Sequence, residues 1–197
     1  MTKLGHNKGP ALVPGAGWRS YCWRRARADL VGAKLPIEIV RQRVRRAREL
    51  GLAYPHYARV LMGSGRDIVG FLFTCDALGL RLRRRLEMPN PVRDKLATIK
   101  RADLLALAPE GEAPEAFRRE LVEISNLDFA AAGETPAGRP WRFAGTAIQA
   151  TLSAAGLPGR GVVLVAEDAA QAWVVPGRLG GFVAADAYFT AGEQGPS

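Results

Sequence analysis

Ile68-Val-Gly-Phe-Leu-Phe-Thr-Cys-Asp-Ala-Leu78 begins with one of the longest uninterrupted apolar stretches of the chain, Ile68 to Phe73, and is the best candidate for the buried core of the amino-terminal half. The residues just before it fit a capping box, in which the Ser64 oxygen accepts an early helical amide and Asp67 returns the bond. The stretch is apolar on nearly all sides, which is typical of a buried helix. We therefore predict a helix from Ser64 to Leu78 at the centre of the amino-terminal half, ended by Gly79.

The two halves of the sequence carry opposite charge. Residues 1–101 hold all five lysines and 17 of the 23 arginines against seven acids, a net charge of +15. From Ala102 onward six arginines face 12 carboxylates, a net charge of −6. An excess of this size repels itself unless an anion neutralises it, and the two candidates are a nucleic-acid backbone and the chain's own acidic half.

The composition is that of a globular protein, with 48% hydrophobic and 24% charged residues in a chain of 197. No apolar stretch approaches the roughly 18 residues of a membrane helix, and the amino terminus has no apolar signal core. We therefore expect a cytoplasmic protein with no membrane partner. Cys22 and Cys75 form no Cys-x-x-Cys pair, and only His6 and His56 could join them as ligands. This pattern indicates buried reduced thiols, no metal and no cofactor.

The pattern of the amino-terminal segment predicts a basic amphipathic helix. Residues 1–17 hold four glycines and two prolines and are typical of a flexible arm. Residues 18–31 place Trp18, Tyr21, Cys22 and Ala26 on one helical stripe, with most of the arginines outside it. The aromatic residues Trp18, Tyr21 and Trp23 are either core residues or stacking platforms for unpaired bases.

Gly5-His6-Asn7-Lys8-Gly9-Pro10 followed by this helix resembles the start of uncharacterised alphaproteobacterial proteins, some of them found in prophage-like regions. The resemblance covers about thirty residues of the chain and brings with it no activity and no catalytic residues. It implies a DNA-associated role.

A second helix carries a row of arginines. Pro36 suits its first turn, and Ile37, Val40, Val44 and Ala47 recur at the spacing of a core-facing stripe. At 100° per residue, three arginines fall within about 60° of one another on an adjacent flank. We call this flank the arginine ridge, and its members are Arg41, Arg45 and Arg48.

The end of this helix suggests a helix-turn-helix. Gly51 permits a sharp turn, and Tyr54-Pro55 begins another helix that runs to Met62. In a helix-turn-helix the second helix would present its outer residues to the major groove while the ridge grips phosphates. Those outer residues are His56, Arg59 and, near the end, Ser64 and Arg66. The same turn also joins helices in many proteins that never bind DNA, and genomes rich in G and C enrich arginine without any ligand.

Leu80 to Met88 alternates apolar and basic residues, which predicts a short strand or extended segment. Its arginines form a second candidate phosphate contact, or equally a charged edge strand protected from pairing. They are Arg81, Arg83, Arg84 and Arg85.

The remaining pattern predicts helices over residues 90–108, 114–127 and 143–155 and strands over 162–166, 172–175 and 181–184. The predicted fold class is α+β: a basic helical region with a helix-turn-helix, followed by a small α/β unit with three short strands. The expected divisions are an arm (1–17), a mainly helical basic region (18–129), a linker (130–142) and the small α/β region (143–197).

Signatures of enzymes are few. The sequence has no P-loop, no Gly-x-Ser-x-Gly elbow and no histidine pair at metal spacing. Gly177 to Gly181 lacks dinucleotide-binding spacing, and Glu167-Asp168 is an acidic pair of the kind found in turns and at helix starts.

Three hypotheses follow. The first is a DNA-associated binding or regulatory protein, acting in transcription regulation through its arginine-rich region on duplex DNA. The second is an interaction protein whose basic face binds its own acidic half or an acidic protein partner. The third is an RNA-binding or RNA-modifying enzyme with no local motif. The sequence predicts no catalytic residue and leaves the oligomeric state open.

Overall fold

The computed structural model describes residues 35–82, 86–136, 138 and 141–190. The predicted arm and the predicted helix over 18–31 lie outside these residues. Residues up to Val40 belong to one unit and residues from Arg41 onward to another, and the account below concerns the second unit.

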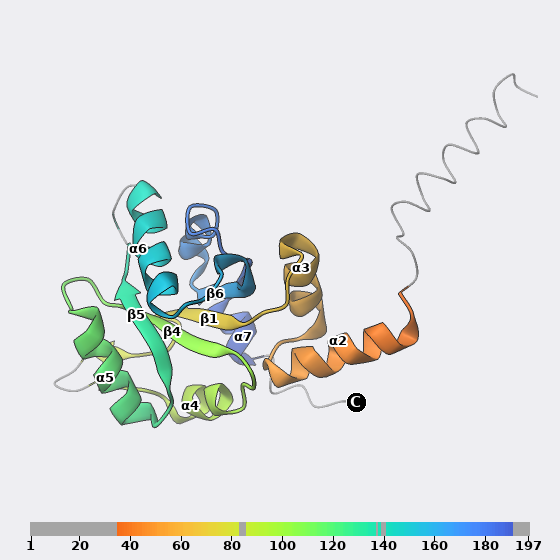
Figure 1. The fold of residues 1–197 in the computed structure, drawn as a ribbon. Coiled ribbons are helices and arrows are strands. Elements are labelled where there is room, and N and C mark those ends of the chain that lie inside the picture. The colour runs from red at the N-terminus through yellow and green to blue at the C-terminus, as the bar shows by residue number, and fades with distance from the viewer. Residues whose placement is uncertain (1–34, 83–85, 137, 139–140, 191–197) are drawn as a thin grey trace, which may run out of the picture. The chain divides into compact units, whose positions relative to one another are not determined.

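A five-stranded sheet forms the centre of this unit (Figure 1). Its strands stand in the order β5-β4-β1-β6-β7, and every neighbouring pair is parallel. β1 is the middle strand, where Phe71 lies beside Leu104 of β4 and Val163 of β6. The strands are β1 (Gly70–Thr74), β4 (Asp103–Ala108), β5 (Phe129–Glu134), β6 (Val162–Ala166) and β7 (Gly181–Ala184).

The helix predicted over residues 64–78 is wrong, because its apolar stretch forms β1. All five residues of β1 are buried, since the strand is covered on both faces and has a neighbour on each side. A strand in this position has no polar face, so its sequence cannot be told from that of a buried helix by periodicity. The expected capping box is also absent: Ser64 Oγ accepts from the Arg66 amide at 3.2 Å, and Asp67 Oδ1 accepts from the Ile68 amide at 2.8 Å.

Three further predictions are corrected. The helix predicted over 90–108 is α4 (Asn90–Ala97) only, and residues from Asp103 continue as β4. The strand predicted over 172–175 is replaced by the end of a 3-10 helix, η2 (Asp168–Trp173), and a following turn. The segment predicted as a linker, 130–142, contains most of β5 and the start of α6 (Trp141–Ala154).

Helices cover both faces of the sheet (Figure 1). Phe71 and Phe73 of β1 pack in one buried cluster with residues of α4, α5 (Pro114–Ser125) and α7 (Ala185–Thr190). Leu72, between them, packs in a second cluster with residues of α6 and η2 on the opposite face. The predicted helices over 114–127 and 143–155 and the predicted strands over 162–166 and 181–184 are confirmed.

The fold is therefore a doubly wound α/β sheet. The prediction of mixed helix and strand is confirmed, but the sheet has five strands instead of three, and it draws three of them from before residue 135. The chain builds outward from β1 to β4 and β5, then crosses back to β6 and builds the other way. The switch point of the topology thus lies between β1 and β6, at whose carboxyl ends sheets of this class bind ligands.

Two helices precede the sheet in sequence, α2 (Ile37–Glu49) and α3 (Tyr54–Ser64), as predicted. Gly51 between them has a φ of 65°, the left-handed conformation that favours glycine. α3 packs its buried residues Tyr57 and Val60 inward, and a Cβ built on Gly181 of β7 would come within 2.8 Å of Val60. α3 therefore packs against one face of β7, in the buried cluster that also holds Val183.

A small antiparallel pair follows β1: β2 (Arg81–Leu82) and β3 (Leu86–Glu87), with Arg81 beside Glu87. This agrees with the extended segment predicted over 80–88. Among the helices of the described residues, none is long and apolar enough to cross a membrane.

Candidate nucleic-acid interface

Arg46 differs from the ridge arginines of α2, because the fold holds its side chain. Its Nε donates to Asp67 Oδ2 at 2.9 Å, and its two terminal nitrogens donate to three carbonyls, those of Ile68, Lys100 and Arg101, at 2.8 to 3.1 Å. Its side chain is only 12% exposed. A planar guanidinium can serve these acceptors together, whereas an ammonium cannot.

Glu49 and Arg101 add ion pairs to the hydrogen bonds of Arg46. Glu49 accepts from Arg46 at 3.4 Å and also pairs with Arg101, which follows α4. The hydrogen bond from Arg101 is the largest of the effects that lower the pKa of Glu49. The sequence analysis gave Arg46 no role, since nothing local shows that its acceptors come from residues about 20 and 55 positions away.

The arginine ridge is on the outside of the same helix. Arg41, Arg45 and Arg48 are all exposed, while Ala47 and Leu50 on another side of the segment are buried. Within the part of the chain that the structure describes, neither Arg45 nor Arg48 forms an ion pair. Arg45 and Arg48 are therefore available to an external anion.

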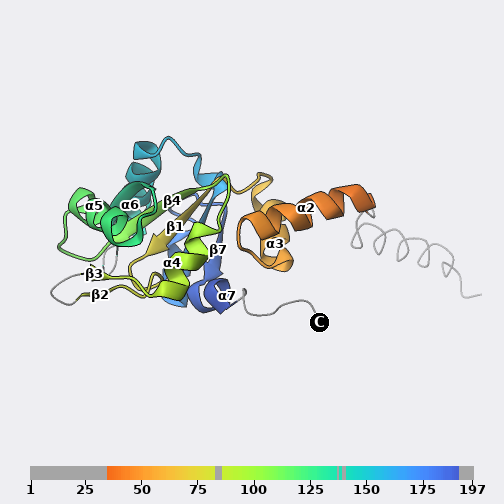
Figure 2. The same ribbon diagram turned by 90° about the horizontal axis from the view of Figure 1, so that it is seen from below.

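The acidic residues of α5 do not cover the ridge. Figure 1 shows α5 near β5, and Figures 1 and 2 both show α5 at the end of the sheet opposite to α2. Glu115 is paired within its own helix, 2.7 Å from Arg118, and this contact lowers its pKa. The arginines of α2 and the glutamates of α5 are thus separated in space.

α3 adds a smaller set of cations. Arg59 and, in the turn after the helix, Arg66 are exposed, whereas His56 is half-buried in its first turn. The Tyr57 hydroxyl donates to Asp67 Oδ1 at 3.1 Å, and burial is the main cause that raises its pKa to about 12. Asp67 therefore fixes α2 and α3 together, through Arg46 and Tyr57.

The second predicted patch is only partly described. Arg81 pairs through its backbone in β2, and nothing is described of its side chain. Arg83, Arg84 and Arg85 lie outside the described residues.

Acidic residues gather at the end of the sheet where the strands have their carboxyl ends, and the sequence analysis missed this acidic end of the sheet. Each of the five strands ends at or just before a carboxylate. Only the pair after β6 had been noted, because the strand assignments of β1, β4 and β5 were needed to see the rest. These residues are Asp76, Glu110, Glu112, Glu134, Glu167, Asp168 and Asp186.

At this acidic end of the sheet, the described residues offer no metal site and no activated thiol. Within the described ranges no three His, Cys, Asp or Glu residues are placed to hold a metal ion. Cys75 follows β1 and is buried, and burial, with smaller contributions from Asp76 and Glu112, raises the pKa of its thiol to about 11. Such a thiol is protonated at neutral pH and is a weak nucleophile.

Comparison with known protein families, characterised proteins and solved structures finds no match to this chain. Function must therefore be inferred from the geometry of the arginine ridge.

Proposed function

We propose that this protein binds duplex DNA through the arginine ridge of α2 and serves as a DNA-associated regulatory protein. The proposal depends on a difference between the arginines of α2. Arg46 forms hydrogen bonds within the fold, whereas Arg45 and Arg48 are exposed and have no carboxylate partner among the described residues. An exposed row of guanidiniums on a helix favours phosphate oxygens, which it can engage with two parallel hydrogen bonds.

In this proposal α3 adjoins the ridge and contacts the duplex in the manner of a helix-turn-helix. Arg59 is its best candidate for reading a base, because it is exposed and guanidinium groups bond guanine in the major groove. His56 and Arg66 would contribute backbone contacts. The mainly apolar inner face of α3 is already used to cover β7.

The test is binding of a fluorescein-labelled 20-base-pair duplex, measured by anisotropy at low salt. R45E/R48E should weaken binding at least tenfold. A matched control is R119E/R142E, which makes the same change of net charge on exposed residues of α5 and α6, at the other end of the sheet. Equal weakening by both pairs would mean that only total charge matters, and the absence of binding by the wild-type chain would remove the proposal.

The main alternative is that the acidic half covers the ridge or that the ridge holds an acidic protein. The position of α5 at the far end of the sheet argues against an internal cover by its glutamates. Replacing Glu112, Glu115, Glu120 and Glu123 with glutamine tests this alternative, which predicts tighter DNA binding. The RNA hypothesis is tested in the same assay by competition with a single-stranded and a duplex RNA of the same length.

A further inference from the structure

The sheet ends in two edge strands, β7 and β5. At β7, α3 packs against one face of the strand, where Val60 lies against Gly181. β5 is the other edge strand, and among the described residues no backbone bond outside the sheet is made by Ala130 to Glu134. An edge strand of this kind offers a row of amides and carbonyls that can pair with another chain.

Charge does not protect this edge. The strand reads Phe129-Ala-Ala-Ala-Gly-Glu134, with no proline and no charge before its last residue. Proteins normally block an exposed edge with lysine, proline or a bulge in the outward-facing part. A register irregularity does occur near Phe129, whose carbonyl accepts from Arg118 at 3.1 Å, so the free portion is the carboxyl half of the strand.

A groove runs beside this free portion. It has a volume of about 380 Å³ and is lined by the end of β5, by one side of α6 and by Pro114 at the start of α5. Phe143, Ala147, Ala150 and Ala154 recur along α6 at helical spacing and make this wall mostly small and apolar. From residue 143 to 154 the helix rises about 16 Å, the length of an extended segment of about five residues.

Gly133 brings this wall close to the strand. A Cβ on Gly133 would lie 1.7 Å from Thr151 Oγ1, so only glycine permits α6 to approach β5 here. Because Gly133 faces α6, the alternation of a strand directs the next side chain, that of Glu134, to the opposite face.

On that opposite side the groove meets an acidic hollow. A second cavity of about 470 Å³ shares Pro114 and Glu134 with the groove and is also lined by Glu110 and Glu112. An added strand would therefore meet small apolar residues on its α6 side and three carboxylates on its α5 side.

From this juxtaposition we propose that the free edge of β5 binds an extended peptide segment of a partner protein in which apolar and basic residues alternate. The peptide adds a strand to the sheet through main-chain hydrogen bonds. Its apolar side chains occupy the groove along α6, and its cationic side chains face Glu110, Glu112 and Glu134. This site is at the opposite end of the sheet from the arginine ridge and does not depend on DNA binding.

The probe is a fluorescein-labelled peptide, Ser-Gly-Val-Arg-Val-Arg-Val-Arg-Gly-Ser, titrated with the full chain and followed by anisotropy. A peptide with glutamate in place of arginine should bind at least tenfold more weakly. A150W, which fills the groove, and E134K should each weaken binding at least fivefold. The matched controls A172W and E123K alter exposed residues away from the groove and should leave binding unchanged.

Two methylated peptides test the strand itself. Successive amides of a strand point to opposite edges, so N-methylation of all valines blocks one edge and N-methylation of all arginines blocks the other. Exactly one of the two should lose binding, because only one edge of the peptide pairs with β5. Absence of binding by the unmodified peptide, or equal binding of both methylated peptides, would overturn the proposal. A dimer that forms without peptide and is lost in A150W would also overturn it, since the edge would then pair with a second copy.

Discussion

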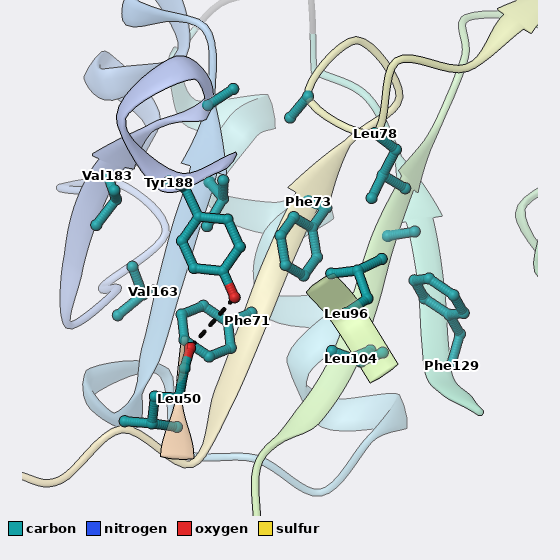
Figure 3. Close-up of a cluster of buried hydrophobic side chains, with 14 of the residues drawn as sticks. Leu50, Phe71, Phe73, Leu78, Leu96, Leu104, Phe129, Val163, Val183 and Tyr188 are labelled. Carbon is teal, nitrogen blue, oxygen red and sulfur yellow. Dashed lines mark hydrogen bonds between the residues drawn. The ribbon is translucent and has the colours of Figure 1, made fainter. Parts of the chain in front are cut away.

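The hydroxyl of Tyr188 donates to the backbone carbonyl of Leu50 at 3.3 Å and joins α7 to the end of α2 across 138 positions of sequence (Figure 3). The ring of Tyr188 packs against Phe71 and Phe73 of the central strand, with centroid distances of 5.5 and 5.8 Å. Lys95 of α4 donates to the Tyr188 carbonyl and lies 4.8 Å from the ring centroid. One buried side chain thus connects three helices with the centre of the sheet.

Y188F should lower the free energy of unfolding by about 1–2 kcal/mol, because it removes the partner of a buried carbonyl but keeps the ring. Y188A should cost more, about 3–5 kcal/mol, since it also leaves a cavity among the phenylalanines. Urea denaturation measures both. Y54F, at a partly exposed tyrosine, is the control and should change stability by less than about 0.5 kcal/mol. A Y188F variant as stable as the wild-type chain would mean that this hydrogen bond does not hold α2.

R46K should be nearly as destabilising as R46A, at about 2–4 kcal/mol, because lysine cannot serve the carboxylate and carbonyl acceptors that surround this position. R45K and R48K should be neutral to within about 0.5 kcal/mol, as expected of exposed sites. Urea denaturation of the four variants distinguishes the structural arginine from the ridge. Similar values for R46K and R45K would contradict this division.

The fragment Met1–Ala131 should not fold. It ends inside β5 and lacks β6, which pairs directly with the central strand β1. Loss of a neighbour of the middle strand exposes its backbone groups and most of one core cluster. Circular dichroism during urea titration should show no cooperative transition. A cooperative transition in this fragment would mean that the amino-terminal half is an independent domain.

Cys75 should react slowly with iodoacetamide. Burial raises the pKa of its thiol from 9.0 to about 11, so at pH 8 the folded protein holds about a hundredfold less thiolate than the unfolded chain. Because the folded state holds this proton more tightly than the unfolded chain, the raised pKa stabilises the fold. This stabilisation is complete below pH 9 and is lost as the pH rises towards 11. Mass spectrometry of the Cys75 peptide in a C22S background measures the rate. A rate equal to that in urea would contradict the burial of this thiol.

The sequence predicted the outer elements better than the centre. α2, α3, α5 and α6 have amphipathic patterns or proline at their starts, and these local signals were read correctly. β1 and the second half of the predicted 90–108 helix were misread, because both are covered on two faces and carry no periodicity that separates a strand from a helix. The error at β1 also hid the doubly wound topology, since the strand order cannot be built without its central member.

The residues of the candidate sites were likewise predictable only where local sequence patterns place them. The exposure of Arg41, Arg45 and Arg48 follows from helical periodicity and was predicted. The structural role of Arg46 could not be predicted, because its acceptors on Asp67, Ile68 and Arg101 depend on the packing of distant segments. The groove beside β5 was hidden for the same reason, since its strand had been assigned to a linker.

The salt dependence of DNA binding tests the central claim most directly. The association constant for a 20-base-pair duplex is measured by anisotropy over a series of KCl concentrations, for the wild-type chain and for R41A/R45A/R48A. Each phosphate contact adds about 0.9 to the slope of log K against log salt concentration, so loss of three ridge contacts should make the slope shallower by about 2.7. Equal slopes for the two proteins would show that the ridge does not face the phosphate backbone.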